Sequence, residues 1–363
     1  MTEYRSRHRA ALEAVDGDGY LAVNHEGSDI ASLRYLTGFT GEGAVLLLSS
    51  AEVVLLTDSR YTEQARGETK GVTIVEDRSW RGKATADAIA SHGLHRVVIP
   101  SDRVSYRWVE RMRELASFEI VPVPDPLMSL RRVKSADELA SLRRAAAIAD
   151  EAFAALLPEL RVGMTEAEAA LRLEILIRET EAEGIAFAVN ASTGPNTALN
   201  HYDPSLAPQP LAKGDLLLFD FGACVNGYRS DITRTVSVGA ADSRAKEIYD
   251  TVLRANLTAI DAVRGGAAAE AVDTVARSVI AEAGHGDAFG HGLGHGIGLE
   301  VHEAPGLRPN GTDTLEPGMV ATIEPGIYYA GYGGVRIEDD VIVCEDGCEV
   351  ITAFPKNELL EVG

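Results

Sequence analysis

Short apolar runs alternate with amphipathic stretches across the first third of the chain. The apolar runs predict strands at residues 19–24, 44–48, 53–57, 72–75 and 97–100. A helical period marks residues 83–91 and 105–116. Strands that alternate with helices are typical of an α/β domain. The sequence therefore predicts an N-terminal α/β domain over residues 1–128, in which we find no phosphate-binding motif and no cluster of metal-ligating residues.

Helical patterns dominate the chain after a proline-rich segment. Residues 121–126 read Val-Pro-Val-Pro-Asp-Pro, which favours a linker. Ser135 with Glu138, and Thr165 with Glu168, have the spacing of capping boxes, and helical patterns run on from them to about residues 158 and 184. A second pair of helices is predicted at residues 243–263 and 268–283. We expect the four helices to cover a sheet in a second domain, residues 129–363.

A predicted hairpin brings two acids together. Asp220 ends an apolar run, where an isolated carboxylate would be costly. The pair Asn226-Gly227 predicts a two-residue type I′ turn. Counting back from this turn places Gly222 opposite Asp231 and makes Asp220 a diagonal neighbour of Asp231, about 7 to 8 Å away on the same face. Two carboxylates this close repel each other unless a cation lies between them.

The same arrangement recurs later in the sequence. Residues 315–324 match residues 211–220 at an offset of 104, with Leu, Gly and an acid in corresponding places. This second copy ends in Glu324, turns through a Gly-rich segment and returns with Arg336 and Glu338, which share a strand face by the two-residue period. The second domain is therefore predicted to contain a pseudo-twofold repeat in which each copy supplies two carboxylates.

Histidines gather in residues 285–302, which hold four of the nine in the chain. His291, His295 and His302 lie in a segment with glycine at every second position from 290 to 298, and His201 is the nearest other histidine. These glycines let backbone or a ligand approach closely and disfavour an ordinary buried strand. An ordinary surface loop is the alternative. The spacing alone does not separate His291 from His295 as a metal ligand.

Four carboxylates with one imidazole form an oxygen-dominated donor set, which suits Mn²⁺ or Co²⁺ better than a thiolate-rich zinc site. Two such ions about 3.5 to 4 Å apart could share carboxylates and lower the pKa of a water between them. This chemistry predicts hydrolysis. For any one of the acids, the alternative is a salt-bridged core residue. The four acids are Asp220, Asp231, Glu324 and Glu338.

Composition narrows the partners and the compartment. The 363 residues are 45% hydrophobic and 25% charged, which is typical of a globular protein. A net charge of -21 argues against nucleic acid and anionic membranes as partners. No apolar run is long enough to span a bilayer, and the N-terminal sequence has no apolar signal core, so we expect a cytoplasmic protein. Three cysteines, an odd number, argue against disulfides and structural zinc.

The candidate ligands resemble those of a known family. Their order and spacing are similar to the dinuclear ligand set of aminopeptidase P and prolidase, proline-specific metallopeptidases of the pita-bread fold: Asp220, Asp231, His295, Glu324 and Glu338. The resemblance covers essentially the whole chain, including the segments around Arg34 and Asp58 and the helix start at 131–138. It implies an α/β architecture with a small creatinase-like domain (1–128), a pita-bread metallopeptidase domain (129–363), and a homodimer or homotetramer that acts on proline-containing peptides.

The resemblance also implies a role for each residue. Asp231 and Glu338 would bridge two divalent metal ions, Mn²⁺ above all, with Co²⁺ or Zn²⁺ as alternatives. Asp220 would complete one metal site, and His295 with Glu324 would complete the other, Glu324 also serving as general base. The remaining residues would hold the substrate, stabilise the tetrahedral intermediate or orient the bridging carboxylates: His201, His291, His302 and Arg336.

Substrate length is the open choice within the resemblance. The expected target is the Xaa-Pro bond, a tertiary amide without an N–H. Prolidases usually carry an arginine shortly after the His-Glu-x-Pro segment to hold a dipeptide's carboxylate, and here Gly306 takes that place. The sequence therefore favours an aminopeptidase that releases the residue before proline. The alternatives are a dipeptidase, in which Arg308 or an arginine of the N-terminal domain holds the carboxylate, and a catalytically silent peptide-binding module.

Overall fold

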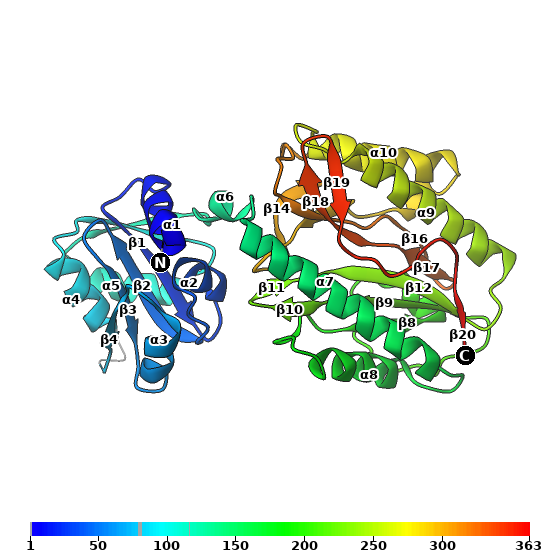
Figure 1. Cartoon of the computed structure of the whole chain (residues 1–363), viewed down its shortest axis with the longest axis horizontal. Coiled ribbons are helices and arrows are strands. Elements are labelled where there is room, and N and C mark those ends of the chain that lie inside the picture. The colour runs from blue at the N-terminus through cyan, green and yellow to red at the C-terminus, as the bar shows by residue number, and fades with distance from the viewer. Residues whose placement is uncertain (1, 79–81, 116) are drawn as a thin grey trace. The chain divides into compact units, whose positions relative to one another are not determined.

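A computed structural model of the chain describes residues 2–78, 82–115 and 117–363. Its contacts divide the chain into two compact units, Met1–Arg131 and Arg132–Gly363. Figure 1 shows the helices and strands of each unit. Among the described helices, none combines the length and the apolar composition that crossing a bilayer requires.

The N-terminal unit contains a six-stranded sheet of order β4-β3-β2-β1-β5-β6, in which only β2 runs against the others. All five predicted strands and both predicted helices are present, although residue 116 lies outside the described residues. The strands are β1 (Gly19–His25), β2 (Gly43–Ser49), β3 (Val53–Thr57), β4 (Thr73–Glu76), β5 (Arg96–Pro100) and β6 (Glu119–Val123). The helices are α1 (Thr2–Glu13), α2 (Ile30–Thr37), α3 (Thr62–Glu68), α4 (Lys83–Ser91), α5 (Tyr106–Leu115) and α6 (Met128–Arg131).

The proline-rich segment differs from its prediction. Its first three residues belong to β6, where Val121 pairs with Val98 and Pro122 with Ile99. Because β6 is the edge strand, the missing N–H of Pro122 leaves no neighbouring strand without a donor. The linker prediction is therefore wrong for residues 121–123, and the division between the units falls after Arg131.

The C-terminal unit has two pairs of long helices, α7 (Ala136–Leu156) with α8 (Glu166–Arg178) and α9 (Ser243–Ala262) with α10 (Ala269–Glu282), each pair lying together (Figure 1). Both predicted capping boxes are confirmed at Ser135 and Thr165. Helix α8 ends earlier than predicted because the chain turns toward β10, where the Glu183 amide donates to the Cys224 carbonyl (2.8 Å). Short 3-10 turns cover Leu157–Glu159, Gly194–Ala198 and Gly286–Ala288.

Two main sheets lie beneath these helices, in place of the one predicted. The first has the order β20-β12-β9-β8 and the second β14-β13-β15-β18-β19. Smaller sheets join β11-β10-β7 and β16-β17. The strands are β7 (Gly184–Ile185), β8 (Asn190–Thr193), β9 (Leu216–Phe221), β10 (Ala223–Val225), β11 (Tyr228–Arg229), β12 (Ile232–Val238), β13 (Gly294–Gly296), β14 (Glu303–Leu307), β15 (Val320–Ile323), β16 (Gly326–Tyr329), β17 (Gly333–Arg336), β18 (Asp339–Cys344), β19 (Gly347–Val350) and β20 (Glu361–Val362).

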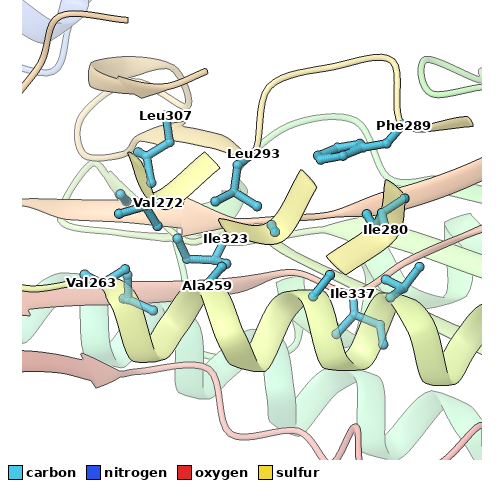
Figure 2. Packing of buried hydrophobic residues seen from close by; sticks show 14 of the residues in the cluster. Ala259, Val263, Val272, Ile280, Phe289, Leu293, Leu307, Ile323 and Ile337 are labelled. Carbon is cyan, nitrogen blue, oxygen red and sulfur yellow. The ribbon is translucent and has the colours of Figure 1, made fainter. Parts of the chain in front are cut away.

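Each helix pair buries its own hydrophobic core. Residues of α7 and α8 pack on β8, β9 and β12, with Phe153 against Phe219 and Phe221. Residues of α9 and α10 pack on β15 to β18, and Figure 2 shows side chains of this second cluster, among them Ala259 and Ile323. Two similar halves, each a helix pair on a sheet, confirm the predicted α/β architecture with a pseudo-twofold repeat.

Candidate metal centre

The first pair of acids comes from the ladder of β9 and β12 and the hairpin at its end. Phe221 pairs with Ile232, and Val225 pairs with Tyr228 across the turn, so the predicted register is confirmed. The same register sets Gly222 opposite Asp231. A Cβ atom at Gly222 would lie only 1.8 Å from the Ser230 carbonyl oxygen, so only glycine fits here. Asp220 and Asp231 therefore sit on one face, two positions out of register.

The second pair comes from the ladder of β15 and β18. Ile323 pairs with Asp339, and Gly326 pairs with Arg336 where β16 and β17 continue the hairpin. Between these two pairings, Glu324 and Glu338 face each other directly. The internal repeat seen in the sequence thus corresponds to two hairpin ladders, and each carries two acids near the point where its main sheet gives way to the hairpin.

His295 reaches the acids from β13, which lies between β14 and β15. Cβ atoms at Gly294 and Gly296 would lie 2.0 Å from the Thr322 carbonyl and 2.2 Å from the Ala304 carbonyl. The expectation that alternate glycines disfavour a strand is therefore wrong for these three residues, because the glycines let both neighbours close in. The ring Nε2 of His295 lies 3.4 Å from Glu324 Oε1 and 3.8 Å from an Asp231 oxygen.

Three of these side chains meet the geometric requirement for a shared cation. Ligand atoms of Asp231, His295 and Glu338 all lie within 4.8 Å of one another, the one group of three or more such residues found in the described residues. Asp220 and Glu324 line the same cavity, which has a volume of about 690 Å³. Asp220 accepts a hydrogen bond from Arg336 at 2.6 Å. All five predicted ligands are thus brought together around one space.

Burial shapes the charges of this cluster. Loss of solvation raises the pKa values of Asp231 and Glu338 well above the ordinary range, and neighbouring carboxylates add to the effect. Burial also raises the pKa of Glu324 to about 7. The pKa of His295 falls to about 4 because burial, and then the nearby His302, disfavour its charged form. Crowded carboxylates beside a neutral imidazole are a donor set that fits divalent metal ions.

Two threonines hold the acids in place, and the sequence did not point to them. The Thr233 hydroxyl donates to Glu338 (2.6 Å) and accepts from Arg336 Nε (2.9 Å). Thr322 donates to Glu324 (3.2 Å) and accepts from the His295 amide (3.1 Å). A signal was present in both cases. Thr233 stands opposite Asp220 in the predicted register, and Thr322 precedes Glu324 by two residues on the same strand face.

The histidines outside the ligand set fall into two kinds. His201 and His302 are exposed and line the cavity, with the His302 ring centred 4.3 Å from that of His295. His291 is more enclosed. Its Nδ1 donates to the Gly292 carbonyl (2.7 Å), and its Nε2 accepts from the Tyr328 hydroxyl (2.9 Å). Both nitrogens of His291 are therefore engaged by the protein.

Tyr328 connects this histidine to Arg336. Its hydroxyl accepts from Arg336 NH1 at 3.2 Å, so one hydrogen-bonded chain runs from His291 through Tyr328 and Arg336 to Asp220. Burial raises the pKa of Tyr328 to about 12, which keeps the hydroxyl protonated as a donor. Tyr328 therefore acts as a hydrogen-bonding link in this chain of residues.

Known families match both units of the chain. Residues 140–345 match the model of metallopeptidase family M24, and residues 5–133 match the creatinase/prolidase N-terminal domain. This chain belongs to metallopeptidase family M24. The family resemblance inferred from the ligand pattern is thereby confirmed. M24 membership implies divalent metal ions, and the buried donor set described above fits them.

Relatives of this M24 peptidase carry different substrate names. It is 39% identical over 344 residues to the uncharacterized peptidase YqhT of Bacillus subtilis, covering 94% of this chain and 96% of that one. The Xaa-Pro dipeptidase structure from Bacillus anthracis matches with a TM-score of 0.92 at 38% identity, over 99% of both chains. The X-Pro aminopeptidase structure from Thermotoga maritima matches at 0.89 and 35%, over 97% of this chain and 99% of that one. These likenesses confirm a proline-peptidase fold and do not resolve whether the substrate is a dipeptide or a longer peptide.

Proposed function

We propose that this M24 peptidase cleaves the Xaa-Pro bond and releases the N-terminal residue from peptides with proline in second position. The observation that carries the proposal is the convergence of the five candidate ligands on one cavity. We assign two divalent metal ions, preferentially Mn²⁺, with Co²⁺ or Zn²⁺ as alternatives, to these ligands: Asp220, Asp231, His295, Glu324 and Glu338. When bound, such ions polarise a carbonyl group and lower the pKa of water.

The remaining catalytic roles would fall to Glu324 and to the residues around the ligands. Glu324 would accept a proton and deliver it to the proline nitrogen, which must be protonated as it leaves. His201 and His302 have side chains exposed in the cavity and would donate to the substrate carbonyl oxygen. His291, with both nitrogens engaged, would act through Tyr328 to hold Arg336 against Asp220.

This arrangement suits a bond to proline. An Xaa-Pro amide has no N–H, so a peptidase that binds that group loses a contact. Groups that act on the carbonyl oxygen and the leaving nitrogen need no such contact. The donors aimed into the cavity therefore match what the substrate offers.

One observation favours the dipeptidase alternative. Arg308 lines the metal cavity, and no hydrogen bond or ion pair engages its guanidinium within the part of the chain that the structure describes. Its Nε lies 3.5 Å from the position of a Cβ at Gly306. Arg308 thus approaches the place where prolidases usually carry an arginine, and a free guanidinium is a partner for a dipeptide's carboxylate.

The deciding experiment compares matched substrates. Chelator-treated protein would be resupplied with Mn²⁺ and given Ala-Pro and Ala-Pro-Ala, with release of the N-terminal alanine measured. We expect faster cleavage of the tripeptide. Cleavage confined to the dipeptide, and lost selectively in Arg308→Ala, would establish the dipeptidase instead. Metal binding without turnover of either peptide would overturn the proposal and leave a silent binding module.

A further inference from the structure

A second cavity adjoins the metal cavity. Its volume is about 610 Å³, and it lies against α8 and the segment 200–205. The two cavities share five lining residues: Phe187, Ala188, Asn200, His201 and Asp220. Because Asp220 lines both, a group bound in the second cavity lies beside the candidate metal ligands. A peptide in the metal cavity could therefore extend a side chain into the second one.

The lining of the second cavity combines an apolar wall with acids. The apolar residues include Ala170, Leu171, Ile185, Phe187 and Val189. Carboxylates come from Glu174, Asp203 and Asp220, and none of the described lining residues is Lys or Arg. The metal cavity, in contrast, includes Arg308 and Arg336. The second cavity is therefore the more cation-attracting of the two.

Glu174 and Asp203 each have one carboxylate oxygen that accepts no hydrogen bond in the described structure. Glu174 receives one hydrogen bond from Arg178, on its Oε1 atom (2.9 Å), in an ion pair at the surface. Asp203 receives the Ser205 amide and hydroxyl on its Oδ1 atom alone (2.8 and 2.6 Å). Glu174 Oε2 and Asp203 Oδ2 remain available as acceptors for a ligand's N–H groups.

Two asparagines give an independent indication of a polar ligand. Asn190 is 7% exposed, lines the second cavity and pairs directly with Asp220 across β8 and β9, so the two side chains share a sheet face. Its Oδ1 has no hydrogen-bond partner in the described structure, and neither has Oδ1 of Asn200. Buried polar groups are ordinarily satisfied, so amides without partners at a cavity wall indicate that a ligand satisfies them.

We propose that the second cavity receives the side chain of the residue before proline and selects lysine or arginine there. The inference rests on the proposed function. Lysine and arginine have an apolar stem and a charged, donor-rich tip. Their stem matches the wall of Leu171 and Phe187, and their tip matches the carboxylates of Glu174 and Asp203. A glutamate side chain in the same position would meet like charge.

The test uses substrates that differ in the side chain of the residue before proline. The metal-loaded full chain would be given lysyl-Pro, norleucyl-Pro and glutamyl-Pro, each as the dipeptide and as the Xaa-Pro-Ala tripeptide, and kcat/KM would be compared within each length. Norleucine keeps the stem of lysine without the charge. We expect lysine to exceed norleucine by roughly two- to fivefold and glutamate to be the poorest. Equal or better cleavage of norleucine would overturn the inference while leaving the proposed function in place. Cleavage of none would overturn both.

A pair of charge-matched variants locates the effect. Glu174→Gln removes a carboxylate that lines the cavity, and Glu179→Gln removes one from the exposed end of the same helix. We expect the lysine-to-norleucine ratio to fall roughly two- to fivefold in Glu174→Gln and to stay unchanged in Glu179→Gln. An equal change in both variants, or an unchanged ratio in Glu174→Gln, would contradict the assignment.

Discussion

The two halves of the C-terminal unit support their acids differently. In the second half, Glu324 is held from within, by Thr322 of its own strand. The other three acids depend on the opposite half. Arg336 of the second half donates to Asp220, and Thr233 of the first half donates to Glu338. The fourth contact joins the Asp231 amide to the Asp340 carboxylate (3.0 Å). The halves repeat in fold, but three of the four acids in the candidate metal centre are contacted by a residue of the opposite half.

The largest effect should follow replacement of Glu338, an acid of the second half that accepts a hydrogen bond from Thr233 of the first half. Glu338→Gln keeps the size of the side chain and removes its charge, so we expect metal to be lost and kcat/KM to fall by at least about a thousandfold. The measurements are metal content after dialysis and turnover of an Xaa-Pro peptide. Glu349→Gln, at an exposed ion pair with Arg143, is the control and should change neither. Full metal content in Glu338→Gln would remove Glu338 from the ligand set.

The next effect compares the two threonines. Thr233→Val breaks a contact between the halves and removes one hydrogen bond from Glu338 and one from Arg336, so we expect a loss of about 10- to 100-fold in metal affinity or kcat/KM. Thr322→Val breaks the local contacts of Glu324 and His295, which are longer, and should cost less. Titration of metal-free protein with Mn²⁺ measures both. A larger loss in Thr322→Val would reverse the comparison between the halves.

The cluster also makes metal-free protein sensitive to pH. The folded-state pKa values of Asp231 and Glu338 are raised well above normal, and that of Glu324 is raised to about 7. These carboxyl groups favour the folded state when they are protonated, so that part of the protein's stability is lost as pH rises through their folded-state pKa values. His295, with its pKa lowered from 6.5 to about 4, opposes this loss as pH rises toward 6.5, and the opposition fades above that value. Between pH 6.5 and 8, metal-free protein should therefore lose stability while metal-loaded protein holds it. Melting curves with and without chelator check this, and parallel curves would count against a buried carboxylate cluster.

The smallest effect is expected for a substitution in the hydrophobic core of the first half. The first core contains an aromatic cluster in which Phe153 contacts three other phenylalanine rings at centroid distances of 4.8 to 5.3 Å. Phe153→Leu should lower the free energy of unfolding by about 1 kcal/mol, because a leucine refills most of the space. Urea unfolding of the metal-loaded chain measures the change. Turnover per folded molecule should stay the same, and a loss of turnover would show that the core also sets the geometry of the acids.

Sequence patterns predicted the site wherever a local rule applied. The Asn226-Gly227 turn was enough to set Asp220 beside Asp231, because a two-residue hairpin dictates its own register. The capping spacings predicted the starts of α7 and α8 for the same reason, since the residues that interact are three positions apart. The choice of His295 over His291 came only from family resemblance.

Contacts between distant segments were beyond sequence reasoning. Arg336 and Asp220 are separated by 116 positions, and nothing in either segment indicates the partner. The edge strand β6 was missed because Pro122 reads locally as a strand breaker, and only the finished sheet shows that one side needs no donor. The three-residue strand at His295 was missed for a similar reason, since its glycines are explained by the neighbours that close around them.

The exchange of contacts between the halves also has a consequence for biosynthesis. A ribosome completes the hairpin that carries Asp220 and Asp231 about a hundred residues before it reaches Arg336, Glu338 and Asp340. Until those residues emerge, the first two acids lack the arginine, the second carboxylate pair and the buried aspartate that later surround them. Loading of the candidate metal centre is therefore expected only after the ribosome has passed residue 340.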